Sequence, residues 1–212
     1  MTLPAAVGIL GGTFDPIHIG HLAIAEAARD SLGLGRVLFI PTRLPVHKPG
    51  VQVADPEDRA AMVVAAIGGN PAFALDRSEI DRTGPSFAVD TLEILAAAAR
   101  AAGEPTDFTF ILSAEAYAGL PSWHRPERLV ELCRFAVVPR PGAGPVDPAV
   151  MERAVAGVGS RTIVLDGPLM AVSGTAIRAR IAEGRSIRYL VPDAVIAYID
   201  DHRLYVAPVS PR

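Results

Sequence analysis

Short apolar runs alternate with segments of helical periodicity along most of the chain, and this alternation is typical of a parallel sheet with crossover helices. The apolar runs predict strands at residues 5–10, 37–41, 72–75, 107–113, 134–139 and 162–165. The helical segments predict helices at residues 20–32, 56–68, 88–102, 126–132, 147–157, 174–183 and 193–202. We therefore expect an α/β fold with a Rossmann-like, doubly wound and mainly parallel sheet and flanking helices.

The pattern predicts a single domain. At 212 residues, half of them apolar, the chain is long enough to bury the core of one α/β domain. Residues 142–145 form a Gly-Ala-Gly-Pro loop rather than a domain linker, because the alternating pattern resumes directly after them. The domain is expected to span residues 1–206, with residues 207–212 as a disordered tail.

Composition narrows the range of functions. The net charge of −3, without a dense cluster of Lys and Arg, disfavours a nucleic-acid binder. Cys133 is the only cysteine, so an intrachain disulfide is excluded, and its apolar surroundings predict a packed thiol. The longest uncharged apolar run, Ala60–Gly69, is too short to span a bilayer. These features predict a cytoplasmic protein with no membrane partner, and they are compatible with a homo-oligomer.

The most informative segment is Ile9–His21, which reads Ile-Leu-Gly-Gly-Thr-Phe-Asp-Pro-Ile-His-Ile-Gly-His. It begins in an apolar strand and breaks at Gly11 and Gly12, where a backbone can approach a ligand closely. A helix that begins near Gly20 directs its unpaired N–H groups and the positive end of its dipole at the preceding loop. This layout predicts a phosphate site.

Two histidines, His18 and His21, stand three positions apart at this helix start and can face the same ligand. Nucleotidyl transfer needs little covalent help from the protein, so two imidazoles that donate hydrogen bonds to phosphate oxygens can act by positioning and charge stabilisation. Two such histidines alone would more often cap or pack a helix. The glycines, together with Phe14 and Asp15 in register, favour the phosphate site.

Two other kinds of site fit this segment poorly. The spacing of Gly8, Gly11 and Gly12 is not that of a dinucleotide-binding G-x-G-x-x-G loop, and the strand at 37–41 is followed by Thr42 and Arg43 rather than by an acid for a ribose. A zinc site would need a third ligand, which the residues after the second histidine do not supply. The sequence therefore predicts no metal held by side chains alone.

Further candidates follow other predicted strands, and ligands of such sheets lie outside the carboxyl ends of the strands. Ser173 is expected to cap the helix at 174–183, with Thr175 and Arg178 in its first turns; this is a second helix start able to hold phosphate, or only a capped helix. Lys48, after the strand at 37–41, is the one lysine beside nineteen arginines. A compact ammonium is favoured there, and a surface lysine in a Pro-rich loop is the alternative.

Several motifs together resemble the bacterial nicotinate-nucleotide adenylyltransferases, a family of the nucleotidyltransferase superfamily with the His-x-Gly-His signature. The first motif is Gly-Gly-Thr-Phe-Asp-Pro-Ile-His-Ile-Gly-His at 11–21, and the second is Ser-Gly-Thr-Ala-Ile-Arg at 173–178. Shorter matches in the family's order and spacing are Arg-Thr-Gly-Pro-Ser at 82–86, Asp-Thr-Leu at 90–92, Pro-Ser-Trp at 121–123, Arg-Pro-Gly at 140–142 and Tyr-Leu-Val-Pro at 189–192. The resemblance covers nearly the whole chain.

This resemblance implies an enzyme that transfers AMP from ATP to nicotinate mononucleotide, giving nicotinate adenine dinucleotide and pyrophosphate in NAD synthesis. It implies that the reaction uses Mg²⁺ and that this ion is bound through the phosphates of ATP. The catalytic residues that it implies are His18, His21, Lys48 and Arg178; the ATP-binding residues are Gly11, Gly12, Thr13, Phe14, Asp15, Gly20, Ser173, Thr175 and Ile177; and the mononucleotide-binding residues are Thr42, Thr83, Ser86, Glu115, Trp123 and Arg140. Apart from the resemblance, the single Trp can offer its face to a pyridine ring or can simply cover the core.

The chain departs from the family pattern on the mononucleotide side. It has Pro-Thr at 41–42, Pro-Val-His at 45–47, Ser-Phe-Ala at 86–88 and Ser-Ala-Glu at 113–115, where the family has Pro-Asn, Pro-Pro-His, Ser-Tyr-Thr and Gly-x-Asp. Adenylyl transfer therefore follows more directly from the sequence than the acceptor does. Two alternatives stay open: another acceptor, such as nicotinamide mononucleotide or, less favoured, phosphopantetheine, and a non-catalytic nucleotide-binding relative.

Overall fold

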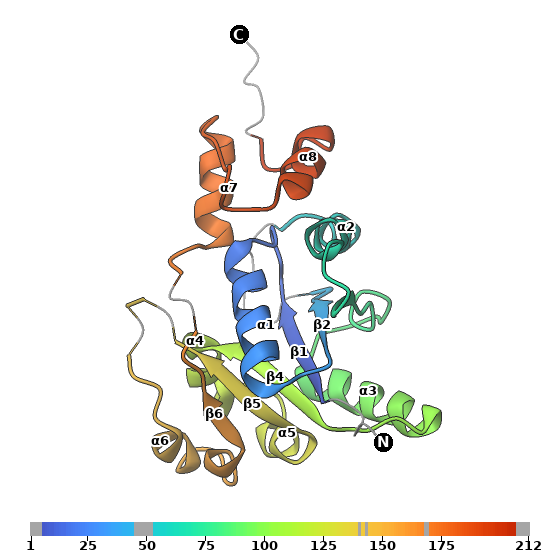
Figure 1. Cartoon of the computed structure of the whole chain (residues 1–212), viewed down its shortest axis with the longest axis vertical. Coiled ribbons are helices and arrows are strands. Elements are labelled where there is room, and N and C mark those ends of the chain that lie inside the picture. The colour runs from blue at the N-terminus through green and yellow to red at the C-terminus, as the bar shows by residue number, and fades with distance from the viewer. Residues whose placement is uncertain (1–5, 45–52, 140, 143, 168–169, 207–212) are drawn as a thin grey trace.

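The computed structural model describes residues 6–44, 53–139, 141–142, 144–167 and 170–206, and within them the chain forms one parallel sheet between two layers of helices (Figure 1). The strands run in the order β3-β2-β1-β4-β5-β6, and every neighbouring pair is parallel. Their bounds are β1 Val7–Gly12, β2 Arg36–Pro41, β3 Phe73–Leu75, β4 Phe108–Ser113, β5 Cys133–Val138 and β6 Thr162–Val164. The predicted doubly wound α/β fold is confirmed.

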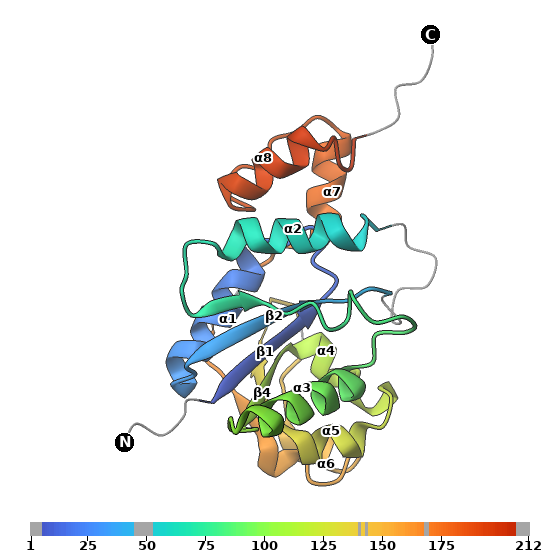
Figure 2. The ribbon, with the colours of Figure 1, turned by 90° about the vertical axis from the view of Figure 1, so that its right-hand side faces the viewer.

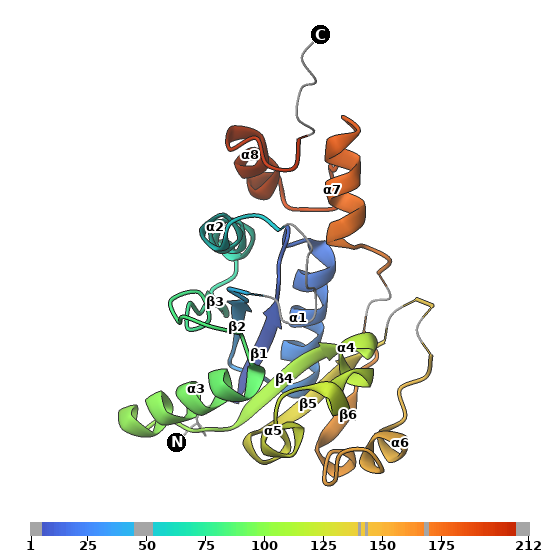
Figure 3. The same cartoon turned by 180° about the vertical axis from the view of Figure 1, so that it is seen from behind.

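Helices cover both faces of the sheet, as Figure 2 shows. Their bounds are α1 Ile19–Leu32, α2 Pro56–Ile67, α3 Ala88–Ala102, α4 Ala114–Ala118, α5 Pro126–Leu132, α6 Pro148–Glu152, α7 Gly174–Ala182 and α8 Asp193–Asp201. One apolar core joins α1, α2, α7 and α8 to one face, and a second joins α3, α4 and α5 to the other. Seen from behind in Figure 3, α4 and α5 lie in front of the sheet and α1 lies behind it.

The alternation of side chains along β4 explains the two cores. Phe108, Phe110 and Leu112 belong to the core beneath α3 and α5, whereas Ile111 belongs to the core beneath α1. Successive side chains of a strand point to opposite faces, so a central parallel strand must be apolar on both. This is why the sequence shows a continuous apolar run here rather than an alternating one.

The sheet opens where the direction of winding reverses, between β1 and β4. Six residue pairs join β1 to β2, but only Val7, Gly8 and Ile9 pair with β4. Beyond Ile9 the two strands separate, and a crevice begins at their carboxyl ends. In doubly wound sheets this switch point is the place where ligands bind.

Several short helical elements differ from the sequence prediction. The helix predicted at 147–157 ends at Glu152, because the carboxylate of Glu152 turns to accept the backbone N–H groups of Gly157 and Gly159, both at 2.7 Å. The short helix α4 and the 3₁₀ turn Leu120–Ser122 were not predicted. Five residues are too few to display a 3.6-residue period, and the cap at Ser113, whose Oγ accepts from the Ala116 N–H at 3.3 Å, is the local signal that marks α4.

None of the helices in the described part of the chain combines the length and apolar character that crossing a membrane requires.

Candidate active site

A cavity of about 520 Å³ occupies the crevice at the carboxyl ends of β1 and β4. The loop after β1 and the start of α1 form one wall, and the start of α7 forms another. From the first wall the cavity is lined by Gly11, Thr13, Phe14, Asp15, His18, Gly20 and His21. From the second it is lined by Ser173, Thr175 and Arg178. The structure thus gathers most of the ATP-side candidates, from segments about 150 residues apart along the chain, around one space.

The two histidines form a stacked pair at the start of α1. Their ring centroids lie 3.7 Å apart and the rings are inclined by 21°. His18 is the N-cap residue, in extended conformation, and its backbone N–H donates to Nδ1 of His21 at 3.2 Å. Because Nδ1 of His21 accepts this bond, a neutral imidazole carries its proton on Nε2. The second nitrogen of His21 is thereby held as a hydrogen-bond donor.

The ring of Phe14 packs against the histidine pair. Its ring is fully buried and meets the ring of His21 edge-on, with centroids 5.0 Å apart. The backbone of Phe14 has a φ of 50°, in the left-handed region that non-glycine residues rarely adopt. Gly12 lets the ring turn under the loop, since a Cβ at this position would lie 3.2 Å from the Phe14 ring.

The start of α7 approaches the β1 loop closely. Ser173 is its N-cap residue, and its Oγ accepts from the Ala176 N–H at 3.2 Å. A Cβ on Gly174 would lie 2.6 Å from the carbonyl oxygen of Asp15, so only glycine permits this approach. The N-termini of α1 and α7 therefore line the same cavity, and both favour an anionic ligand there.

Arg178 is held at the cavity wall by the backbone of the β1 loop. Its Nη1 donates to the carbonyl oxygen of Asp15 at 2.6 Å and lies 3.3 Å from the Asp15 Oδ2, while its Nη2 donates to Oγ1 of Thr175 at 3.4 Å. The side chain of Arg178 remains about a quarter exposed. It can therefore present positive charge to a ligand while its position is fixed.

Two of the ATP-side candidates lie outside the cavity lining. Ile177 is fully buried in the core between α7 and the rest of the domain, and Gly12 packs against the ring of Phe14. Their part in ATP binding stays a prediction. Lys48 and Arg140 fall outside the described residues.

None of the described mononucleotide-side candidates belongs to the lining of this cavity. The N–H of Thr42 donates to the Gly12 carbonyl at 3.0 Å, which places the end of β2 against the β1 loop. Trp123 meets Phe110 edge-on at 5.9 Å, and a Cβ on Gly11 would lie 3.4 Å from that phenyl ring. Of the remaining candidates, Ser86 is buried, Thr83 is exposed, and Glu115 lies in the first turn of α4.

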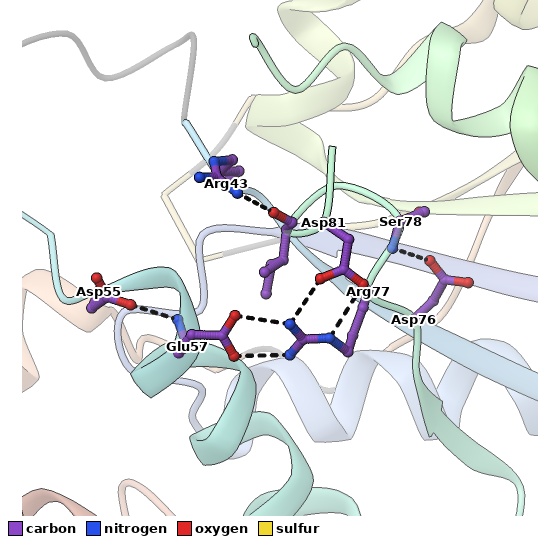
Figure 4. Close-up of polar contacts among 8 residues, drawn as sticks. Arg43, Asp55, Glu57, Asp76, Arg77, Ser78 and Asp81 are labelled. Atoms are coloured by element: carbon purple, nitrogen blue, oxygen red, sulfur yellow. Dashed lines mark hydrogen bonds and ion pairs between the residues drawn. The ribbon is translucent and has the colours of Figure 1, made fainter. Parts of the chain in front are cut away.

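A set of polar contacts joins the end of β2, the start of α2 and the turn after β3 (Figure 4). Arg43 donates its N–H to Oγ of Ser86 at 3.0 Å and its guanidinium to the Ile80 carbonyl at 2.5 Å. Arg77 joins Glu57, at the start of α2, to Asp81, with Nη2 at 2.8 Å from both carboxylates. The turn after β3 is therefore fastened both to the end of β2 and to α2.

Glu79 lies beneath the same turn. It is 6% exposed, and burial raises the pKa of its carboxyl group. Its Oε1 accepts from the Thr91 hydroxyl at 2.8 Å, which ties the turn to α3. The sequence analysis missed Glu79, because nothing in its neighbourhood separates it from an ordinary surface acid.

Arg59 is a buried residue whose structural role the sequence did not indicate. It is 0% exposed, and its guanidinium donates to three backbone carbonyls, those of Thr13 at 2.7 Å, Ala54 at 3.0 Å and Arg43 at 3.2 Å. Burial lowers its pKa, and the nearby carboxylate of Asp15 opposes that shift. Arg59 therefore holds the β1 loop to the chain on both sides of the segment between β2 and α2.

Comparison with known proteins assigns the chain to a family. The Cytidylyltransferase-like family model matches residues 9–180. A relative from Roseiflexus sp. (strain RS-1), named probable nicotinate-nucleotide adenylyltransferase, is 47% identical over 201 residues, which cover 95% of this chain and 98% of the relative. A relative of the same name from Salinibacter ruber is 42% identical over 199 residues, 94% of this chain and 97% of the relative. The chain belongs to the nicotinate-nucleotide adenylyltransferase family.

Solved structures share the fold of this nicotinate-nucleotide adenylyltransferase family member. The Plasmodium falciparum nicotinic acid mononucleotide adenylyltransferase complexed with APC superposes with a TM-score of 0.75 at 17% identity, over 95% of this chain and 97% of the other. The same enzyme complexed with NaAD gives a TM-score of 0.74 at 16% identity and the same coverage. At this level of identity the likeness establishes the architecture of the sheet and its helices.

The side chains that line the cavity determine how a metal ion could bind there. Within the described ranges, no group of three or more His, Cys, Asp and Glu side chains could hold a metal ion. The acid in the cavity wall, Asp15, already faces Arg178 and accepts two hydrogen bonds at Oδ1. An ion coordinated by the phosphates of a nucleotide fits this site better than one bound by protein carboxylates.

Gly174→Ala tests the close approach of α7. The added methyl group would meet the Asp15 carbonyl at 2.6 Å, so either α7 or the β1 loop must move. We expect a loss of more than tenfold in kcat/KM, since misplacement by about 1 Å can cost a hundredfold in rate. Gly184→Ala, after the end of α7, is the matched control; its φ of 67° introduces strain, but nothing lies within 4 Å of the added methyl. Steady-state kinetics of both variants, with thermal melting, check the prediction. Equal kinetics for the two variants would contradict it.

Proposed function

We propose that this protein transfers AMP from ATP to nicotinate mononucleotide and releases pyrophosphate, a step that forms the dinucleotide precursor of NAD. The observation that carries the proposal is the convergence of two helix N-termini, the stacked histidines and Arg178 on one cavity at the switch point of the sheet. The relatives described above are named for this activity, and a structural neighbour was solved with NaAD. Non-catalytic nucleotide binding is disfavoured, because His21 is held as a donor that binding alone does not require.

The proposed reaction is a direct displacement. A phosphate oxygen of the mononucleotide attacks the α-phosphorus of ATP, the bond from that phosphorus to the bridging oxygen breaks, and pyrophosphate leaves with the electron pair. His18 and His21 donate hydrogen bonds to the transferring phosphate as its charge redistributes, and Arg178 with the N-terminus of α7 holds the departing phosphates. Mg²⁺ would be held by the phosphates of ATP rather than by side chains of the protein, and would supply charge neutralisation there. A cytoplasmic location stays a prediction.

The displacement predicts inversion of configuration at phosphorus. The described part of the cavity offers hydrogen-bond donors and positive charge, which suit direct attack by the phosphate of the acceptor. A single in-line attack inverts the α-phosphorus, whereas an adenylated enzyme would invert it twice. ATP carrying a chiral α-phosphorothioate gives the result directly. Net retention would contradict direct transfer.

The identity of the acceptor rests on different residues from the transfer step. The nicotinate ring differs from nicotinamide by one carboxylate in place of a carboxamide, so selection needs hydrogen-bond donors directed at that group. Ala88, at the start of α3, lacks the hydroxyl that a threonine would supply beside Ser86. This favours a weaker preference than the family pattern implies, and transfer to nicotinamide mononucleotide is the second candidate.

We expect kcat/KM for nicotinate mononucleotide to exceed that for the amide by about tenfold or more, because charge-assisted hydrogen bonds contribute about 1.5–3 kcal/mol. Ala88→Thr should increase the ratio. A coupled pyrophosphate assay with both mononucleotides and with phosphopantetheine, and product identification by mass spectrometry, measures it. A ratio near one, or a preference for the amide, would support the second candidate, and no turnover with any acceptor would overturn the proposed function.

A further inference from the structure

The turn after α8, at the end of the described chain, contacts the loop that follows β1. The hydroxyl of Tyr205 donates to Oδ1 of Asp15 at 2.7 Å, across 190 residues of sequence. Burial raises the pKa of Tyr205, with the hydrogen bond to Asp15 as the second cause, so this hydroxyl stays protonated and donates at every physiological pH. Arg203 and Tyr205 both have positive φ, 52° and 64°, and this backbone turn returns the chain after α8.

The two carboxylate oxygens of Asp15 have different partners. Oδ1 accepts from the Tyr205 hydroxyl and from the Ala54 N–H, the latter at 3.1 Å. Oδ2 lies 3.3 Å from Nη1 of Arg178. Asp15 is 5% exposed, so this carboxylate has little access to water and its orientation is set by the groups that contact it. The hydroxyl of Tyr205 thus fixes the acid that faces the arginine of the cavity wall.

One nitrogen of the Arg178 guanidinium, Nη1, is used in contacts with Asp15. Nη1 is held by the carbonyl and the carboxylate of Asp15, and Nη2 lies on the side of Thr175, which lines the cavity. If the carboxylate of Asp15 turned, Nη1 would lose its ionic partner and keep only the bond to the Asp15 carbonyl, so the guanidinium would be held less firmly. A planar guanidinium binds phosphate well only when its edge is correctly presented.

We propose that Tyr205 is a positioning residue for the nucleotide, acting through Asp15 to aim Arg178 at the phosphates of ATP. This deepens the proposed function and rests on it. It assigns to the C-terminal turn a role in substrate binding in addition to covering the core. The expected consequence is that loss of one hydroxyl, well away from the reacting atoms, weakens nucleotide binding.

The chain supplies a matched control for this proposal. Tyr198, in α8, donates its hydroxyl to Oδ1 of Asp58 in α2 at 2.9 Å. This is also a tyrosine-to-aspartate hydrogen bond that joins the C-terminal segment to the rest of the domain, but its acceptor lies in α2 and not in the loop after β1. Tyr198→Phe and Tyr205→Phe therefore remove the same chemical group from the same segment.

The experiment measures the affinity of both variants and the parent for a non-hydrolysable ATP analogue by calorimetry, with thermal melting beside it. A guanidinium that is wrongly aimed loses about one charge-assisted hydrogen bond to phosphate, which corresponds to roughly tenfold in a binding constant. We expect about that loss in analogue affinity for Tyr205→Phe, a similar rise in the KM for ATP, and an unchanged KM for the mononucleotide. Tyr198→Phe should keep the affinity of the parent. If both variants lose stability but keep the affinity of the parent, Tyr205 is only structural and the proposal is overturned.

A double-mutant cycle tests the route through Arg178. If Tyr205 acts by aiming this guanidinium, Tyr205→Phe should cost no further affinity in an Arg178→Met background, since coupled residues are non-additive. An equal loss in both backgrounds would overturn the proposal. Asp15→Asn, which keeps an acceptor for Tyr205 but removes the charge facing Arg178, should reproduce the loss and serves if Tyr205→Phe fails to fold. Analogue binding needs no acceptor, so an inactive parent that binds the analogue would refute the proposed function and leave this test intact.

Discussion

Replacing either His18 or His21 with alanine is expected to lower kcat by roughly a hundredfold or more, while the KM for ATP changes little. The physical reason is that the proposed hydrogen bonds strengthen as charge moves onto the transferring phosphate, and the loss of one such donor costs about 3 kcal/mol of transition-state stabilisation. The stacked pair adds a second effect for His18, whose ring packs against His21 at 3.7 Å. His18→Ala should therefore also loosen the partner ring.

The control is His202→Ala, which removes an imidazole that stacks on Tyr198 at 3.9 Å, at the far end of α8. This variant should keep the turnover of the parent. Single-turnover rates with saturating ATP separate the chemical step from binding. Near-normal turnover in both His18→Ala and His21→Ala would refute the mechanism proposed for this pair.

The strands and most helices could be predicted because each element carries its own local signal. The central strands are buried on both faces and read as short apolar runs, and α1 and α3 end at Gly33 and Gly103 in left-handed conformation, as helices often do. The helix predicted at 147–157 ends early because of a side-chain-to-backbone contact within the same segment. The carboxylate of Glu152 folds back on later backbone N–H groups, and periodicity does not encode that turn.

The cavity walls formed by the loop after β1 and the start of α7 could be predicted because their residues form two contiguous segments. The loop from Gly11 to His21 and the turn from Ser173 to Arg178 each show strand-to-helix or cap signals in sequence, and the sheet topology brings them together. The residues that hold these segments carry no such signal. Tyr205 and Asp15 stand 190 positions apart, and only the fold makes them neighbours.

The role of Asp15 illustrates the limit of motif reading. Its place in the loop predicts contact with ATP, and it does line the cavity. Its carboxylate, however, is occupied by groups of the protein from α7, from the segment before α2 and from the C-terminal turn. A residue within a signature can thus serve the site by holding other residues, and a sequence does not distinguish the two roles.

Arg59→Met is expected to cost the largest amount of stability of the single substitutions considered, about 3 kcal/mol, because it leaves buried carbonyl oxygens without their donor. The methionine side chain fills much of the same volume, so the loss reports the missing hydrogen bonds rather than a cavity. Three carbonyls depend on this guanidinium, those of Thr13, Arg43 and Ala54. Arg59→Lys should recover only part of the loss, since one ammonium cannot reproduce a fork that reaches three acceptors.

Arg77→Met is the matched control for this prediction. Arg77 makes four hydrogen bonds to Glu57 and Asp81, one more than Arg59 makes, but its side chain is 39% exposed and water can replace its partners. Denaturant unfolding should give a much smaller shift in midpoint for Arg77→Met than for Arg59→Met, with unchanged slopes. If the two shifts were equal, burial would not be the reason for the importance of Arg59. If Arg59→Met lost stability but kept the kinetics of the parent, the three carbonyls would support the fold without shaping the loop after β1 that lines the cavity.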